Sequence, residues 1–368
     1  MKRFVTAGHI CLDITPAFPE GFSGSVQSVF RPGRLTQVGQ AAFSLGGSVG
    51  NTGMAMKKIG AEVTLLGKVG DDAFGRLMAS MLEERGAGGL ITDPAGETGY
   101  TLVLAVPGYD RFFLHNPGAN DTFSAGDIPW DAIKDAAVFH FGYPTLMRRM
   151  YENGGEELLR MFRRAKELGM ATSLDLTAVD PHSPAGLADW EGILARALPY
   201  ADFFVPSFEE LCFMLDREKW TALMAEGDDP VARLDLREDA LPLAQKALSL
   251  GCGAVLIKCG TAGMALVTAD EERLSRIGAR FGLDASRWEN QRVCVPSFRA
   301  PRVKSASGAG DSSIAAFLIA AAGGRDPEKC VLLAAAEGAM AVTEYDASTA
   351  VLPLSELEEK IRAGWPVN

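Results

Sequence analysis

The sequence has little of what marks metal-binding, disulfide-rich or membrane proteins. Six cysteines are scattered over 368 residues without C-x-x-C spacing, and four histidines form no cluster along the chain. This distribution disfavours a zinc site or a disulfide framework and predicts reduced thiols in the core. There is no apolar run of the roughly 18 residues that a membrane span requires, and no apolar stretch of signal-peptide length at the start. We therefore expect a cytoplasmic protein with no membrane partner.

Basic residues are also scarce. Lysine and arginine number 36 against 47 acidic residues, which gives a formal net charge of −11. The lack of a basic stripe to replace counterions argues against a nucleic-acid or anionic-membrane partner. An anionic ligand would have to be held by local features: helix ends, a few lysine or arginine side chains, and a divalent cation.

Two common nucleotide-binding motifs are missing. There is no G-x-x-x-x-G-K-[ST], and no G-x-G-x-x-G follows the first predicted strand. These absences argue against a P-loop enzyme and a Rossmann dehydrogenase. With 47% hydrophobic residues, the chain can still bury a large core. From residue 138 onward, predicted strands and helices alternate without a linker, which favours a parallel sheet covered by helices; these elements are 138–142, 156–168, 171–176, 186–198, 201–205 and 253–258.

One stretch combines a glycine-rich turn with the start of an apolar helix. It reads Gly308-Ala309-Gly310-Asp311, and the proline-free apolar run of residues 314–322 predicts a helix that begins at the turn. The first amides of a helix have no carbonyl partner within it, and the helix dipole adds to their attraction for an anion. We therefore predict a phosphoryl site at the amides of residues 309–311.

Asp311 is unexpected in such a place, because its charge would repel a phosphate. A carboxylate beside an anion site makes sense if it accepts a proton, so Asp311 is the candidate general base. The alternative is an ordinary helix N-cap in a glycine-containing loop.

A second glycine-rich stretch, residues 46–60, has Gly46 and Gly47 at its start and Asn51 one helical turn later. Paired glycines let a polyol approach the backbone, and the Asn51 amide can both donate to and accept from hydroxyls. Residues 46–50 also fit the G-x-S-x-G elbow of hydrolases, with Ser48 as nucleophile. That interpretation is not favoured, because the downstream histidines have no recognisable supporting context: His115, His140 and His182.

Together, these stretches resemble the signatures of the ribokinase-like sugar kinases, the phosphofructokinase B (PfkB) family. The resemblance covers residues 4 to about 353, and its motifs come in family order, namely Asp13, Gly46-Gly47 with Asn51, Glu210, Gly260 with Gly263, and Gly308 to Asp311. It implies a single α/β domain over residues 1–368, a ribokinase-like three-layer α/β/α sandwich with a mostly parallel central sheet and a small β-sheet lid. We place the lid strands in about 14–45, where the composition predicts no helix, and 98–116. Two segments, about 216–240 and 270–292, are interpreted as insertions.

The resemblance also implies roles for individual residues. The amides of Gly308 to Asp311 would form the anion hole, and Asp311 would deprotonate the acceptor hydroxyl. Asp13, Gly46, Gly47 and Asn51 would bind the sugar, and Arg111 would either reach it from the lid or remain a solvated charge. Lys258, Gly260 and Gly263 would face ATP, Ser348 would edge the adenine pocket, and Glu210 would organise the water shell of Mg²⁺. The resemblance also leaves open a homodimer formed through the lid strands.

The chain departs from the family pattern at three positions. Ser207 replaces an asparagine near Glu210, Ser305 replaces an aspartate six residues ahead of the base, and Asp346 stands where glycine is usual. In relatives the missing aspartate helps to hold a monovalent cation, so activation by K⁺ is in doubt here. Lys304 is either a substitute positive charge or an exposed side chain.

The sequence therefore predicts an ATP-dependent sugar kinase. The acceptor could be fructose, ribose, ketodeoxygluconate, a nucleoside or a phosphorylated sugar. The rival hypothesis is a sugar or nucleoside sensor on the same fold, whose altered positions have cost it catalysis.

Overall fold

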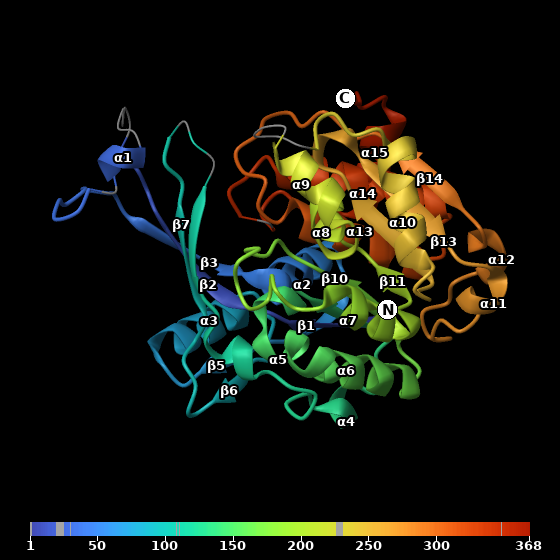
Figure 1. Cartoon of the computed structure of the whole chain (residues 1–368), viewed down its shortest axis with the longest axis horizontal. Helices are drawn as coiled ribbons and strands as arrows, with labels where there is room; N and C mark the ends of the chain where they lie inside the picture. Colours follow the sequence, from blue (N-terminus) through green and yellow to red (C-terminus); the bar gives the residue numbers. More distant parts are fainter. Residues whose placement is uncertain are drawn as a thin grey trace.

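An eight-stranded sheet forms the centre of the molecule (Figure 1). The computed structural model describes residues 2–19, 26–29, 31–107, 109, 111–225, 231–346 and 348–368. The strand order is β14-β13-β12-β11-β10-β9-β1-β4; β13 is antiparallel to both neighbours, and the other neighbouring pairs are parallel. The strands are β1 (Arg3–Gly8), β4 (Glu62–Leu66), β9 (Val138–Gly142), β10 (Ala171–Asp175), β11 (Phe203–Phe204), β12 (Ala254–Lys258), β13 (Met264–Thr268) and β14 (Arg292–Val295).

Helices cover both faces of this sheet. Because successive strand residues point to opposite sides, Phe139 and Phe141 of β9 join one hydrophobic cluster while Val138 joins the other. The first cluster includes residues of α6 (Glu156–Glu167), α7 (Trp190–Ala197), α8 (Phe208–Leu215) and α10 (Leu241–Leu248). The second includes residues of α2 (Gly47–Ile59), α13 (Ala309–Ala322), α14 (Pro327–Ala341) and α15 (Leu354–Arg362). The predicted three-layer α/β/α sandwich is confirmed.

Predicted element boundaries differ from the observed ones where local chemistry intervenes. Helix α7 begins at Trp190 rather than at residue 186, because the Asp189 side chain accepts from the Gly192 amide and caps the helix. Strand β4 ends at Leu66. Lys68 already belongs to β5 (Lys68–Gly70), which pairs with β6 (Ile91–Asp93) outside the central sheet. Further helices are α3 (Ala73–Glu84), α4 (Trp130–Ile133) and α5 (Arg148–Tyr151).

A four-stranded sheet projects from the carboxyl side of the central sheet as a lid (Figure 1). Its order is β3-β2-β7-β8, from the strands β2 (Cys11–Pro16), β3 (Ala41–Gly46), β7 (Tyr100–Leu104) and β8 (Phe112–Asn116). The lid thus begins at Cys11, earlier than predicted. The expectation of no helix between residues 14 and 45 was wrong, since Val26–Val29 forms the single-turn helix α1. These four residues contain no proline or glycine to prevent one helical turn.

Both segments interpreted as insertions contribute buried residues to the core. The first contains α9 (Arg217–Ala225) and a π-helical turn, Leu236–Ala240. The second contains α11 (Glu271–Leu274) and α12 (Ala285–Trp288), and it buries Phe281 and Trp288. The rings of Phe281 and Trp288 lie 4.9 Å and 6.2 Å from the Phe203 ring of β11, so this segment contributes to the core.

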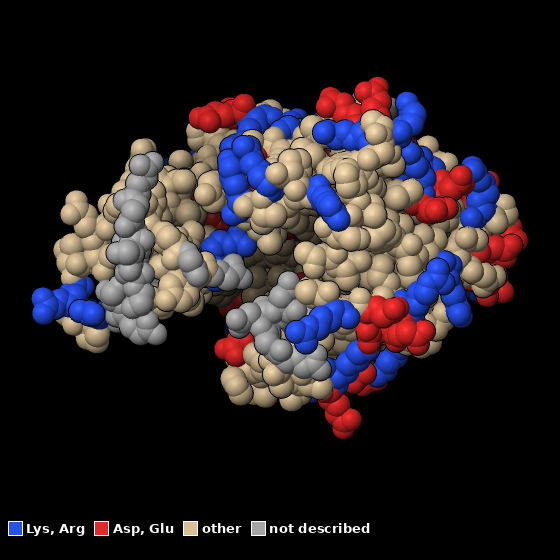
Figure 2. Space-filling model, turned by 90° about the horizontal axis from the view of Figure 1, so that it is seen from above, with Lys and Arg blue, Asp and Glu red and all other residues tan. Residues whose placement is uncertain are grey.

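The surface carries acidic and basic side chains side by side on the face seen in Figure 2, which is hollowed between the lid and the main body. Within the described ranges, no helix has both the length and the apolar character needed to cross a bilayer. All six cysteines are free, and five of them are buried.

Candidate active site

The two glycine-rich stretches meet at the carboxylate of Asp311. The Nδ2 of Asn51 donates to Oδ2 of Asp311 at 3.1 Å, and Oγ1 of Thr52 donates to Oδ1 at 2.9 Å. Both donors lie in the first half of α2, which packs along α13. The contact places the start of α2 beside the start of α13.

Asp311 is only 3% exposed and receives a third hydrogen bond, from the Tyr143 hydroxyl to Oδ2 at 2.7 Å. Burial raises the pKa of the Asp311 carboxyl, and the Tyr143 hydrogen bond and the charge of Lys258 oppose that rise. Tyr143 itself has φ 65°, the left-handed region that non-glycine residues seldom adopt. A buried carboxylate with three donors has a fixed direction, as a general base requires.

The helix α13 begins at the glycine turn, as the sequence predicts, but only two of the three predicted amides are without a bond in that turn. Gly308 is the N-cap at φ 75°, and the helix begins at Ala309, so Asp311 is not the N-cap. The Ala309 amide makes a long turn bond of 3.3 Å to the Ala306 carbonyl, and the Ser312 amide closes the helix on Gly308 at 2.9 Å. Gly310 and Asp311 therefore contribute the first-turn amides that have no helical acceptor.

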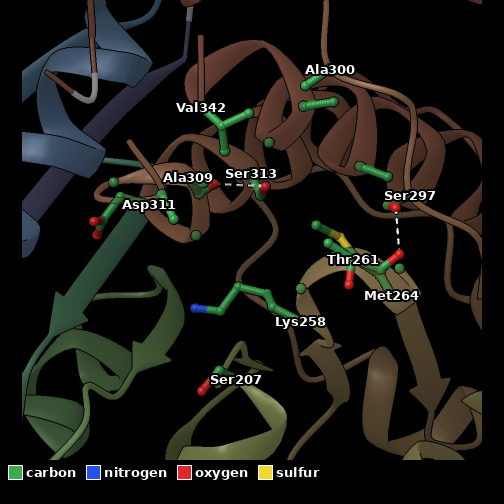
Figure 3. A pocket seen from close by; sticks show the side chains of 18 of the residues that line it. Ser207, Lys258, Thr261, Met264, Ser297, Ala300, Ala309, Asp311, Ser313 and Val342 are labelled. Carbon is green, nitrogen blue, oxygen red and sulfur yellow. Dashed lines mark hydrogen bonds between the residues drawn. The ribbon is translucent and has the colours of Figure 1, made fainter. Parts of the chain in front are cut away.

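A cavity of about 750 Å³ opens in front of these amides (Figure 3). One part is polar and is lined by Asp311, Asp175, Lys258 and Glu210. Another part is apolar and is lined by Phe298, Ala335, Ala339 and Val342. In size and lining, the cavity fits a small-molecule site with one charged and one apolar end.

Lys258, at the end of β12, extends into the cavity below the start of α13 (Figure 3). Its Nζ lies 2.7 Å from Oδ1 of Asp175, the last residue of β10. Burial alone would lower the pKa of Lys258, but the charges of Asp175 and Glu210 outweigh burial and raise it. The lysine therefore stays charged at the polar end of the cavity.

Glu210 and Ser207 form a capping box at the start of α8. The Ser207 amide donates to Oε2 of Glu210 at 2.7 Å, and the Glu210 amide donates to the Ser207 hydroxyl at 3.3 Å. Serine thus serves as an N-cap where the family has asparagine, and Glu210 still lines the cavity.

The glycines of the turn after β12 are fitted closely to their surroundings. Gly260 and Gly263 both line the cavity and have positive φ, and a Cβ at Gly263 would lie 2.1 Å from the Val295 carbonyl oxygen. Ser348 is not among the residues that line the cavity. Its hydroxyl and amide donate to Asp346 Oδ1 in a turn.

Asp13 lies against the start of the first glycine-rich stretch. A Cβ at Gly46 would lie 2.4 Å from the Asp13 carboxylate oxygens, and a Cβ at Gly47 would lie 2.6 Å from His9. Burial raises the pKa of Asp13 to about 6, opposed by hydrogen bonds from Cys11 and Thr101. The paired glycines therefore make room for the side chains that face them.

Arg111 is not a solvated charge, and its contact with a substrate stays a prediction. Its guanidinium donates to the Ser305 hydroxyl at 2.7 Å and also to the Ser307 hydroxyl, and so ties the lid to the segment before the anion turn. Lys304 instead pairs with Glu344 at 2.6 Å. Arg111, rather than Lys304, therefore brings positive charge to position 305.

The hydrolase interpretation fails on burial. Ser48 and His140 do approach to 3.4 Å, but both are 0% exposed, and Nδ1 of His140 faces the Ser173 hydroxyl instead of a carboxylate. Burial lowers the pKa of His140 to about 3, so it is a poor proton acceptor. A substrate cannot reach the buried Ser48, and His140 faces a serine where a triad has an acid. These residues therefore do not form a catalytic triad.

Three residues at the site were missed: Thr52, Tyr143 and Asp175. Tyr143 and Asp175 stand at the carboxyl ends of the neighbouring parallel strands β9 and β10. Ligands bind at that edge of open α/β sheets, so strand-end position was the available signal.

Comparison with known proteins agrees with this architecture. The model of the pfkB family carbohydrate kinases matches residues 7–353. Fructokinase-1 of Zea mays is 34% identical over 134 residues, 35% of this chain and 41% of that protein. The probable fructokinase-5 of Arabidopsis thaliana is 27% identical over 278 residues, 74% of this chain and 72% of that protein. The matched region thus spans about two fifths of the maize relative.

Two solved structures share the fold over nearly the whole chain. The fructokinase of Xylella fastidiosa, solved with bound ATP, has a TM-score of 0.70 at 22% identity and covers 98% of both chains. The ribokinase of Arabidopsis thaliana, solved with ribose and ATP, has a TM-score of 0.70 at 19% identity and covers 97% of this chain and 98% of its own. The predicted ribokinase-like fold is confirmed.

Proposed function

Because the chain belongs to the pfkB family of carbohydrate kinases, we propose that it transfers the γ-phosphoryl group of ATP to a hydroxyl of a small carbohydrate. One observation carries the proposal. The Asp311 carboxylate is held by three side-chain donors next to the first-turn amides of α13, at the mouth of a cavity of about 750 Å³. A base and an anion site side by side are the parts that phosphoryl transfer to an alcohol needs.

In the proposed reaction, Asp311 takes the proton of the attacking hydroxyl. The amides of Gly310 and Asp311, with Ala309 and the left-handed Gly308 shaping the turn, stabilise the charge on the transferred phosphoryl group. Asn51, Thr52 and Tyr143 direct the carboxylate and favour its ionised form. Asn51 donates its amide to the base, so it orients Asp311 in addition to any contact with sugar.

The sugar site is proposed between the lid and the start of α2. Asp13 would accept from sugar hydroxyls, and the absence of a side chain at Gly46 leaves room for the Asp13 carboxylate that would do so. Arg111 would hold the lid over this region through the hydroxyls of Ser305 and Ser307. A closed lid would keep water from the phosphoryl donor.

The nucleotide is proposed to lie along the cavity. Lys258 and the turn with Gly260 and Gly263 would face the phosphates, and the apolar end at Ala339 and Val342 would take the base, in place of the predicted Ser348. The polar end of the cavity suits a nucleotide with Mg²⁺, because a buried lysine and carboxylate oxygens lie together there. Glu210 and Asp175 would hold Mg²⁺, which neutralises phosphate charge when bound.

Fructose is the first acceptor to test, because the curated relatives in the comparison include fructokinases from maize and Arabidopsis. The altered positions Ser207, Ser305 and Asp346 keep a sensor as the second hypothesis. The experiment is a phosphorylation assay with ATP and Mg²⁺ over a panel of ketoses, aldoses, sugar acids and nucleosides. Phosphorylation of one class supports the proposal, whereas a thermal shift with sugars and no product supports the sensor.

A homodimer through the lid is also proposed. The lid exposes large apolar side chains, which commonly mark interaction surfaces: Phe43, Phe113 and Leu114 are 49%, 54% and 54% exposed. Light scattering of the purified protein should give the mass of two chains, and Phe113→Ser with Leu114→Ser should give one.

A further inference from the structure

Two histidines and a cysteine that are far apart in the sequence meet where the lid joins the central sheet. His9 lies between β1 and β2, Cys11 begins β2, and His115 lies on β8. One nitrogen or sulfur atom from each lies within 4.8 Å of the other two. The proposed kinase chemistry uses none of these three side chains.

The spacing of the imidazoles suits a tetrahedral ion. The Nε2 atoms of His9 and His115 lie 3.2 Å apart. Two nitrogens bound to one tetrahedral Zn²⁺ at about 2.05 Å would lie about 3.3 Å apart. Without an ion, the two Nε2 atoms can form one hydrogen bond with each other. A bound ion would instead accept the lone pair of each Nε2 atom.

The groups around the cluster are placed as supports for metal ligands. Nδ1 of His115 lies 3.0 Å from the Thr101 hydroxyl, which fixes the ring and leaves Nε2 directed at His9. The Cys11 sulfur lies 3.4 Å from the same hydroxyl and 3.3 Å from Asp13. His9 is 1% exposed, and its Nδ1 has no hydrogen-bond partner among the described residues. His9 and Cys11 are thus buried, and His115 is partly exposed.

We propose that His9, Cys11 and His115 form a binding site for a borderline-soft divalent cation of the Zn²⁺ type, with the fourth position left to water. Mixed imidazole and thiolate ligands select such an ion over Mg²⁺, which prefers oxygen. A bound ion would tie β8 and β2 of the lid to the end of β1. The site is separate from the proposed Mg²⁺ position at Glu210 and does not depend on kinase activity.

The test uses the full chain without an affinity tag, titrated with Co²⁺ as the spectroscopic probe and then with Zn²⁺. The expected result is one Co²⁺ per chain with visible bands of tetrahedral cobalt and a sulfur-to-cobalt charge-transfer band, both removed by Zn²⁺. Cys11→Ser should abolish the charge-transfer band, and His115→Gln should weaken binding strongly. Thr101→Val, which keeps all three ligands and the shape of the core, should weaken binding by about 10- to 100-fold.

The matched controls are Cys294→Ser and His182→Gln, which remove a thiol and an imidazole outside the cluster. Both should bind Co²⁺ as the unchanged protein does. Circular dichroism of each variant establishes that it is folded. Absence of the charge-transfer band in the unchanged protein, or equal binding by folded Cys11→Ser and His115→Gln variants, would overturn the proposal.

Discussion

The side-chain amide nitrogen of Asn51 lies 3.1 Å from Oδ2 of Asp311, although 260 positions separate the two residues in the chain. The bond joins the first half of the long helix α2 to the first turn of α13. Neither side chain can change its direction without affecting the other. Since Thr52 and Tyr143 bond the same carboxylate, the proposed base is positioned by several elements at once.

Thr52→Val removes one donor to the proposed base while keeping the shape of the side chain. A hydrogen bond to a charged group contributes about 1.5–3 kcal/mol, so kcat should fall about 10- to 100-fold. Losing a donor to the carboxylate raises its pKa, so the acid limb of the kcat–pH profile should move to higher pH. Steady-state kinetics across pH measure both effects. Thr343→Val is the control and should leave the profile in place, because the hydroxyl of this buried threonine donates to the Met340 carbonyl, away from the proposed base.

Lys258→Met should destabilise the protein by leaving the Asp175 carboxylate without its partner. Breaking a buried ion pair from one side costs about 3–5 kcal/mol, because the remaining charge is uncompensated. Urea unfolding of the variant measures the cost. The double variant Lys258→Met with Asp175→Asn should recover part of it. Equal stability of the single variant and the unchanged protein would mean that the pair is solvated.

Arg111→Met should cut the tie between the lid and the segment before α13. Its hydrogen bonds to the Ser305 and Ser307 hydroxyls involve a charged donor, so kcat/KM for sugar should fall about 10- to 100-fold. Arg76→Met, which removes an exposed ion pair on α3, is the control.

The unchanged protein should turn over at similar rates in potassium and in a bulky organic cation. Position 305 has no carboxylate to hold a monovalent ion, and the Arg111 guanidinium lies on its hydroxyl instead. A strong potassium requirement would show that the site binds the ion despite the serine.

Glu337→Gln should stabilise the protein at alkaline pH. Burial in α14 raises the pKa of Glu337 to about 8, and Oε1 has no partner among the described residues. Between about pH 4.5 and 8 the native state keeps a proton that the unfolded chain has lost. The stability contributed by this group is therefore complete below pH 4.5 and declines as the pH rises to 8. The variant should lack this decline and gain about 1–4 kcal/mol at high pH, measured by urea unfolding. An unchanged pH dependence would place Glu337 in a hydrated environment.

The sequence predicts well what depends on local pattern. The turn at Gly308 and the start of α13 follow from glycine positions and an apolar run, and strands such as β9 follow from short apolar runs. The observed boundary of an element differs from the predicted one where a single side chain sets it, as Asp189 does at the start of α7. Trp288 packs into the core, but the sequence does not predict this, because the charged segment around it has no hydrophobic periodicity.

The site is harder to predict because its contacts connect distant parts of the chain. Asp175 and Tyr143 belong to no motif, and only their positions at strand ends bring them to the cavity. Lys304 and Arg111 are both basic residues that could serve position 305, and nothing local distinguishes them. The structure decides, because the lid folds Arg111 over Ser305 while Glu344 engages Lys304.

The most direct test of the account is the turnover number of Asp311→Asn with ATP, Mg²⁺ and the best sugar of the panel. Asparagine keeps the size of the side chain but cannot take the hydroxyl proton, so kcat should fall by about 10² to 10⁴. Sugar affinity, measured separately by calorimetry, should change little. A variant that turns over at nearly the unchanged rate would contradict the assignment of Asp311 as the base.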